Sequence, residues 1–388
     1  MAQAVGNGCL VRHVTYAMKL GVCVAVVVAL VAAFGGALQV GVFDALLLSW
    51  GPSIIGFAIE RSRIPMQQRF QGFINDDSLH VVLCGTSSPF PDPDRAGPCT
   101  LVMGGGELFI VDTGPASVRK MGVLNVDLGR LTGIFLTHYH SDHIGDFGEA
   151  VVNSWIQGRR EPVPTYGPPG VKNIVEGFGQ AYAMDQTYRT AHHEEDNMPQ
   201  AGSRATAVEF PLPPAGGAEV LTTSRGIKVT AFEMDHYPVH PAVGYRFEFH
   251  GRTVLVTGDG EPFAELTKQH EGADLVVRNT ISKPLMLQLS AALNSTGRSS
   301  FDRLGKMTWD TLDYHSDPLE AMADAAKYQT KLLVICHFAP PMVNLIQRLL
   351  AKAVYRKTPA GWSGGIAWGQ DGDHWVLPKG TGDIHQIS

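Results

Sequence analysis

The residues that could do chemistry are concentrated in one short stretch, LTHYHSDHIGD, at positions 136–146. Three histidines and an aspartate, His138, His140, Asp142 and His143, lie within six residues. His138 and His140 alternate at strand spacing, so both imidazoles should point to the same side at the end of the apolar run GIFLT. Polar groups at the end of a buried strand are costly unless they are paired or bind an ion. The pattern therefore predicts a metal site.

This HxHxDH run resembles the signature of the metallo-β-lactamase-fold hydrolases, and further stretches in chain order carry the resemblance. LFIVDTGPAS resembles the family's strand-ending Asp-Thr-Gly, in which Asp112 would orient a ligand histidine from outside the metal shell. VTGDG resembles the element whose aspartate, here Asp259, bridges two metal ions. LLVICHFAPP resembles the late strand that ends in a ligand histidine, here His337. The opening LCGTSSPFPDPDRAGPCTLV is similar to that of the ribonuclease Z and arylsulfatase-like subgroup.

The resemblance implies a complete two-metal site, with one ligand to be chosen between two histidines. His236 is favoured because it follows the apolar run IKVTAFEM, with only Asp235 between, whereas His240 lies in a predicted loop and could line the pocket. The first metal would bind His138, His140 and His236, and the second would bind Asp142, His143 and His337, with Asp259 bridging. This set favours two Zn²⁺ ions, with Mn²⁺ and Fe²⁺ as alternatives. Two such ions can activate a hydroxide that attacks phosphorus, sulfur or carbonyl carbon.

His315 stands in a Tyr-His-Ser context just before a predicted helix that leads into the strand of His337. In ribonuclease Z-like enzymes a histidine in a similar context assists the leaving group, so the resemblance implies a general acid or transition-state donor. The alternative is a helix-start histidine that only binds the backbone. We predict Asp142 and His315 as the catalytic residues.

Apolar and β-branched runs that end at Gly or Pro predict β-strands around these residues. They cover residues 79–85, 99–114 (with a turn at 104–106), 131–138, 226–232, 243–249, 253–257 and 331–337, and a final hairpin at 364–377 turns at 370–372. Helices are expected at 148–157, 171–184 and 317–328, and residues 190–217 should form a surface insertion. The predicted fold class is α/β, a four-layer αββα sandwich of the metallo-β-lactamase fold with an N-terminal apolar helix.

The N-terminal region differs from the rest in composition. Arg12 and Lys19 precede residues 20–43, which hold no charge, and this pattern is typical of an export signal or a membrane anchor. A shorter apolar stretch at 45–59 predicts an interfacial element. We therefore expect an export signal or anchor in residues 1–66, a linker in 67–78 and the hydrolase domain in 79–388. The catalytic domain should lie outside the cytoplasm.

The five cysteines form neither a zinc ribbon nor a disulfide framework. Cys84 and Cys99 can pair if their strands form a hairpin and the compartment is oxidising. Two unpaired thiols are the favoured alternative.

Three departures from the ribonuclease Z pattern bear on the substrate. The resemblance implies a long arm that grips tRNA before the bridging aspartate, but only residues 247–258 separate Arg246 from Asp259. The family's His-Glu-Ala is replaced by Arg-Asn-Thr at positions 278–280, which removes a glutamate from the site. Gly260 stands in place of a threonine, which removes a hydroxyl.

The missing arm, the predicted export and the net charge of −6 argue against nucleic acid as a partner. We therefore expect a zinc-dependent hydrolase that cleaves small phosphodiesters or aryl sulfate esters and contacts a membrane through its N-terminal segment. The alternatives are a lactonase or β-lactamase, a tRNA 3′-processing endoribonuclease, and a non-catalytic membrane-tethered metal-binding module. The oligomeric state is left open, with a homodimer as one possibility.

Overall fold

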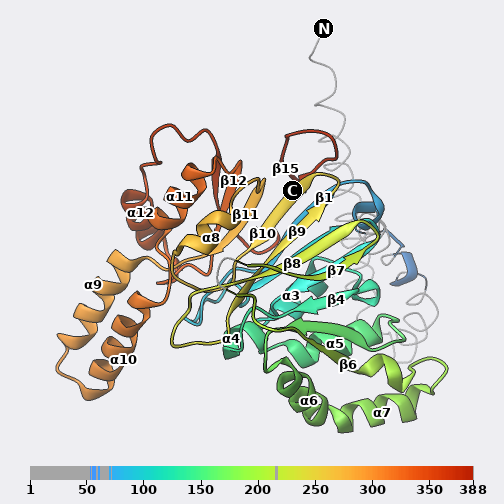
Figure 1. Cartoon of the computed structure of the whole chain (residues 1–388). Coiled ribbons are helices and arrows are strands. Elements are labelled where there is room, and N and C mark those ends of the chain that lie inside the picture. Colours follow the sequence, from blue (N-terminus) through green and yellow to red (C-terminus); the bar gives the residue numbers. More distant parts are fainter. Residues whose placement is uncertain are drawn as a thin grey trace, which may run out of the picture. The chain divides into compact units, whose positions relative to one another are not determined.

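Two facing β-sheets organise the part of the chain that the computed structural model describes, namely residues 53, 55–57, 60–61, 70, 72–214 and 217–387 (Figure 1). The first sheet has the strand order β15-β14-β1-β2-β3-β4-β5-β6. Its strands are β1 (Leu79–Gly85), β2 (Cys99–Gly104), β3 (Glu107–Val111), β4 (Gly133–Phe135), β5 (Val163–Gly167), β6 (Ala205–Glu209), β14 (His374–Leu377) and β15 (His385–Ile387).

The second sheet has the order β13-β12-β11-β10-β9-β8-β7. Its strands are β7 (Glu219–Ser224), β8 (Ile227–Glu233), β9 (Val243–Phe249), β10 (Arg252–Val256), β11 (Leu275–Asn279), β12 (Leu332–Cys336) and β13 (Gly365–Trp368). Every position of β10 and β11 is buried, which explains why residues 254–256 and 275–277 are continuous apolar runs rather than alternating ones.

The main core lies between the two sheets. Phe109 and Phe135 of the first sheet meet Phe247 of the second, with ring centroids 6.0 Å and 5.7 Å apart. Tyr245 packs on Phe135 and donates its hydroxyl to the carbonyl of Leu136, directly before the HxHxDH run. The aromatic layer therefore also ties the second sheet to the strand end that carries the predicted ligands.

Helices cover both outer faces of the pair of sheets. The outer face of the first sheet packs on α3 (Ser117–Val123), α5 (Phe147–Ile156) and α6 (Val171–Ala181), and that of the second on α8 (Ala264–Gln269) and α11 (Pro318–Lys327). Further helices are α4 (Ser141–Ile144), α7 (Ala183–His193), α9 (Lys283–Asn294), α10 (Ser299–Asp310) and α12 (Leu345–Val354), with 3₁₀ turns at Leu128–Arg130, Gln200–Ser203 and Thr311–Asp313. The described residues thus form the mixed α/β fold with two sheets that the sequence predicts.

The predicted helix at 317–328 is confirmed as α11, and its start has a local cause. The Asp317 carboxylate accepts the backbone N–H of Leu319, while the Glu320 carboxylate accepts the N–H of Asp317, which forms a capping box. Pro318 occupies the first helical position, where no hydrogen bond is lost.

The final predicted hairpin is wrong. β13 pairs in parallel with β12 in the second sheet, whereas β14 pairs with β1 in the first. The turn between them therefore crosses from one sheet to the other, which turn residues alone cannot distinguish from a hairpin. The predicted surface insertion at 190–217 is also corrected in part, because it contains the edge strand β6.

Cys84 and Cys99 form a disulfide, so the favoured expectation of two free thiols is wrong. Their strands β1 and β2 are antiparallel neighbours in the first sheet, which places the two Cα atoms 5.0 Å apart. Cys336, among the described residues, is free and buried.

α9 and α10 run side by side as a helical pair that extends from the second sheet (Figure 1). The Ser290 hydroxyl donates to the carbonyl of Gly305 across this pair, and a Cβ atom at Gly305 would collide with the side chain of Asn294. The sequence patterns considered above predicted no element here.

The predicted apolar helix at 20–43 lies outside the described residues. Within the described part of the chain, no helix combines the length and hydrophobicity needed to cross a bilayer. The boundaries at residues 66 and 78 stay a prediction. Ile74, within the predicted linker, is buried against the first sheet's outer core, and its carbonyl accepts the N–H of Gly106.

His270 should make the fold less stable in acid. Burial first, and then the nearby Arg278 charge, lower the pKa of His270 to about 3, so the unfolded chain binds a proton at this group between pH 3 and 6.5 that the folded chain does not. The contribution is complete above pH 6.5 and is lost as the pH falls. Between pH 7 and pH 5 it should remove about 2 kcal/mol from the free energy of unfolding.

Urea denaturation of wild type and His270→Gln at both pH values would measure this loss as the difference in pH dependence. The exposed His385→Gln is the matched control and should behave as wild type. Equal pH dependence in all three proteins would contradict the assignment.

Candidate metal centre

All seven predicted ligands lie at or just beyond strand ends of the two sheets. His138 and His140 follow β4, and Asp142 and His143 lie in the short helix α4 that comes next. The others follow the second sheet's strands β8, β10 and β12: His236, Asp259 and His337. Parallel pairing of β10, β11 and β12 brings their carboxyl ends to one edge, so residues far apart in the chain meet there.

The structure brings these side chains into three overlapping groups. Within each group the potential ligand atoms lie within 4.8 Å of one another: His138, His140, His236 and Asp259; Asp142, His143 and His337; and Asp259, His315 and His337. Asp259 Oδ2 is central, at 3.3 Å from the Nε2 atoms of His143 and His315 and 3.4 Å from His337 Nε2.

The donor set fits a metal ion because two buried ring nitrogens are directed at the cluster and have no hydrogen-bond partner among the described residues. His236 Nδ1 donates to the carbonyl of Tyr314 at 2.7 Å, which leaves the Nε2 lone pair directed at the cluster. His143 is held in the same way, with Nδ1 donating to Asp112 at 2.7 Å. Both Nε2 atoms are buried and have no hydrogen-bond partner among the described residues. The cluster is therefore able to hold metal.

Asp112 is placed to orient this cluster. Its Oδ1 accepts the Thr137 N–H at 2.8 Å, and its Oδ2 accepts the Thr137 hydroxyl at 2.8 Å as well as the His143 ring N–H. Its backbone is left-handed, with φ 58°, a conformation that a non-glycine residue adopts at a cost. Three hydrogen bonds thus fix a carboxylate behind His143.

Burial and neighbouring charges shift the pKa values of the clustered groups. Burial would lower the pKa of His143, but the charges of Asp259 and Asp112 outweigh it and raise the value, whereas the pKa values of Asp142, His236 and His138 are lowered. Burial alone would raise the pKa of Asp142, but the charges of His143 and His337 outweigh it and lower the value to about 2. Burial lowers the pKa of His236 to about 4, and burial together with His143 lowers that of His138. Ionised carboxylates and neutral imidazoles are the forms that bind metal.

Comparison with known proteins shows the family to which the chain with this cluster belongs. The model of the metallo-beta-lactamase superfamily matches residues 92–275. Ribonuclease Z of Mycolicibacterium paratuberculosis is 34% identical over 268 residues, which cover 68% of this chain and 88% of that protein. The chain belongs to the metallo-beta-lactamase superfamily. A second ribonuclease Z, that of Mycobacterium bovis, is likewise 34% identical over 265 residues, covering 68% of this chain and 86% of its own.

Solved structures of this superfamily share the fold at lower identity. Human tRNase Z, short form, has a TM-score of 0.54 at 20% identity and covers 77% of this chain and 99% of its own. The metallo-beta-lactamase fold protein YhfI from Bacillus subtilis has a TM-score of 0.53 at 20% identity, covering 77% and 100%.

These homologues overturn two expectations from the sequence. Their name marks RNA as their substrate, so the exclusion of nucleic acid as a partner is wrong. The strands β9 and β10 are indeed joined by a tight turn at His250–Gly251, without an arm. The missing arm and the net charge of −6 were therefore not sufficient grounds to exclude nucleic acid, because a chain with both features is still 34% identical to ribonucleases Z.

The expected membrane-anchored or exported location is also wrong, and the finding that overturns it is again the homology to ribonucleases Z. It rested on the apolar run at residues 20–43, and the described residues hold no helix able to span a membrane.

Asn279 is a site residue to which we assigned no role from the sequence. It ends β11, and its Nδ2 donates to Asp259 Oδ1 at 2.9 Å. An amide therefore holds the central carboxylate where the family's pattern has a glutamate. The sequence contained a sign of this contact, because Asn279 ends the strand that follows the one leading to Asp259 and so could have been expected near that carboxylate.

The backbone explains why position 260 is a glycine where the family pattern has a threonine. Its φ is +154°, and a Cβ atom would lie 2.8 Å from the carbonyl oxygen of Asp235 and 2.9 Å from Met234 Cε. A threonine therefore does not fit this backbone.

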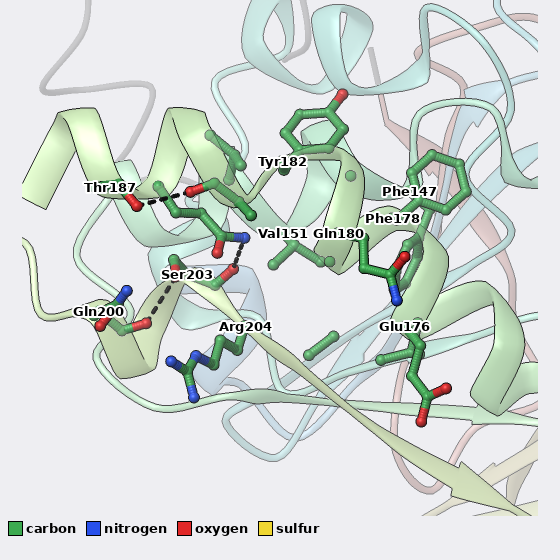
Figure 2. A pocket seen from close by; sticks show the side chains of 17 residues that line it. Phe147, Val151, Glu176, Phe178, Gln180, Tyr182, Thr187, Gln200, Ser203 and Arg204 are labelled. Atoms are coloured by element: carbon green, nitrogen blue, oxygen red, sulfur yellow. Dashed lines mark hydrogen bonds between the residues drawn. The ribbon is translucent and has the colours of Figure 1, made fainter.

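His240, the ligand candidate not chosen, is exposed and lies outside the cluster, although it lines a hollow of about 290 Å³ beside His236. A larger hollow of about 470 Å³ lies between α5, α6, α7 and β6 (Figure 2). Phe147, Phe178 and Tyr182 form one side of it, and the Gln186 amide donates to the carbonyl of Ser203 across it. No residue of the described metal cluster lines this second hollow.

Replacing Asp112 by Asn should weaken metal binding by about 10–100-fold, the usual effect of losing a carboxylate behind a ligand histidine. The new amide cannot accept from Thr137 and His143 as two carboxylate oxygens do. Competition between the protein and a chromogenic chelator for Zn²⁺ would measure the affinity.

Asp302→Asn, at an exposed carboxylate on α10, is the control and should bind Zn²⁺ like wild type. An unchanged Zn²⁺ affinity in Asp112→Asn would show that Asp112 does not support the metal-binding histidine.

Proposed function

We propose that this chain is a metal-dependent endoribonuclease of the ribonuclease Z type, which cleaves a phosphodiester bond at the 3′ end of tRNA precursors. The identity of 34% over 88% of a ribonuclease Z carries the proposal. The catalytic apparatus would lie in residues 79–388. No observation on the described residues favours an aryl sulfate, a lactone or a β-lactam as the substrate.

The residues that would hold two zinc ions are those of the cluster, with Asp259 shared between them. When bound, the ions would supply a hydroxide nucleophile and neutralise charge that develops on the phosphoryl oxygens. Asp142 would help hold the same ion as His337 and His143, because its Oδ2 lies 3.2 Å from His337 Nε2 and 3.6 Å from His143 Nε2. From that position its carboxylate would also orient the nucleophile. Asn279 would keep Asp259 in one orientation through the 2.9 Å hydrogen bond.

His315 is placed to protonate the leaving oxygen. Its Nδ1 lies 3.2 Å from the carbonyl of Thr311, and its Nε2 lies 3.3 Å from Asp259 Oδ2. When both nitrogens carry protons, Nδ1 donates to the backbone and Nε2 faces the cluster. The RNA 3′ oxygen is a poor leaving group, so a proton delivered from Nε2 would lower the barrier. The alternative of a histidine that only binds backbone does not explain the Nε2 contact.

A substrate panel on the full chain loaded with Zn²⁺ tests the proposed activity. A tRNA precursor with a 3′ trailer should be cut, whereas p-nitrophenyl sulfate, a lactone and a β-lactam should not. Asp259→Ala should reduce cleavage by at least about 100-fold, because both predicted metal sites lose a ligand. Turnover of the sulfate, lactone or lactam without cleavage of the precursor would contradict the proposal.

His315→Ala separates a general acid from a structural role. With the tRNA precursor, kcat should fall by about 10²–10⁴-fold, because the leaving alkoxide is no longer protonated. With bis-p-nitrophenyl phosphate, kcat should fall less than about tenfold, since p-nitrophenolate leaves without a proton. Equal losses on both substrates would assign His315 a positioning role only.

A further inference from the structure

A pocket of about 400 Å³ opens beside the metal cluster and has no role in the chemistry above. Phe338, which lines it, directly follows His337, and Ser87 directly follows Thr86, whose carbonyl accepts the His337 N–H at 3.0 Å. Phe338 therefore places one wall of the pocket a single residue, about 3.8 Å along the chain, from the ligand candidate His337. Ser87 places a second wall one residue from the carbonyl that His337 contacts through its backbone. A substrate bound at the metals would continue into this space.

The aromatic side chain of Trp368 lines the pocket and packs against two other aromatic rings. Trp368 lies 5.3 Å from Phe338 and 5.6 Å from Tyr355, measured between ring centroids. Tyr355 is itself anchored, because its hydroxyl contacts Ser282 and Asp317 at 2.6 and 2.8 Å. Trp368 is still 37% exposed, so its indole is fixed in place and accessible. A rigid, accessible indole is suited to stacking on a planar ring.

Cations predominate at the rim of this pocket. Arg348, on α12, uses Nε to donate to the carbonyl of Met342 and is otherwise exposed. Arg95 donates to the Thr86 hydroxyl and to the carbonyl of Gly369. Asp92 is the one carboxylate among the lining residues, and it lies 3.9 Å from Arg95. The rim thus favours an anionic group next to the planar ring.

We propose that this pocket binds an unpaired nucleotide of the RNA next to the scissile phosphate, with the base stacked on Trp368 and its phosphate beside Arg348. The assignment rests on the proposed ribonuclease function. A nucleotide combines the planar ring and the negative charge that the pocket matches, and its chain connects directly to the phosphate at the metals. The pocket would therefore set which strand segment enters the centre.

Trp368→Ala should raise KM for a tRNA precursor about tenfold, the size of effect that loss of one base–aromatic stack produces. Trp368→Phe should restore most of the affinity, and Arg348→Gln should raise KM and weaken its salt dependence. Kinetics on bis-p-nitrophenyl phosphate should be unchanged in all three, which shows that the metal centre is intact. Trp309→Ala, at an exposed tryptophan on α10, is the matched control and should leave both substrates unaffected.

Precursors with a single abasic site, placed in turn on either side of the cleavage point, identify the stacked base. One such substrate should bind wild type about tenfold more weakly and lose no further affinity with Trp368→Ala. An effect of Trp368→Ala that persists on every abasic substrate, or an unchanged KM on the intact one, overturns the inference while the ribonuclease activity stands. If wild type cleaves no RNA, the proposed function is wrong and the nucleotide assignment fails with it.

Discussion

The carboxylate of Asp259 sets the central constraint of this structure, because it is only 2% exposed and must stay charged. Histidine nitrogens surround its Oδ2 atom at 3.3–4.0 Å. Burial would raise the pKa of Asp259, but the charges of His337 and His143 outweigh it and hold the value well below its usual range. An isolated carboxylate at this depth would be too costly to keep ionised. The convergence of strand ends from both sheets supplies the compensation.

Rigid support behind the cluster determines its geometry. Asp112 holds His143, the Tyr314 carbonyl holds His236, and Asn279 holds Asp259. Two residues of the site, Asp112 and His337, have positive φ values of 58° and 56°. Such backbone conformations persist only where surrounding contacts over-determine them. Here the neighbouring hydrogen bonds and the aromatic core between the sheets provide those contacts and hold the predicted ligands in place.

The homology indicates the class of substrate, whereas the pocket beside the metal cluster indicates where that substrate would bind. Similarity to ribonucleases Z points to RNA, although this chain lacks an arm between β9 and β10. The pocket between α12 and the loop that contains Arg95 offers a second place where a strand of RNA could be held close to the metals. Its aromatic and cationic side chains come from segments around residues 87–95, 338–348 and 368. Parallel pairing of β13 with β12 places Trp368 beside Ile335, and the hydrogen bond from Arg95 to the carbonyl of Gly369 brings the Arg95 loop to the same place.

The sequence by itself determined the ligand types, the superfamily and most of the strands. These follow from local information, because HxHxDH is contiguous and each of His236, Asp259 and His337 lies within three residues of the end of an apolar run. The tertiary structure decided whatever depends on pairing partners: the Cys84–Cys99 disulfide, the assignment of β13 and β14 to different sheets, and the role of Asn279. Strand patterns do not specify their neighbours, since the same apolar run can pair with several others. Contacts between strands that are far apart in the chain, or that belong to different sheets, therefore become visible only once the chain is folded.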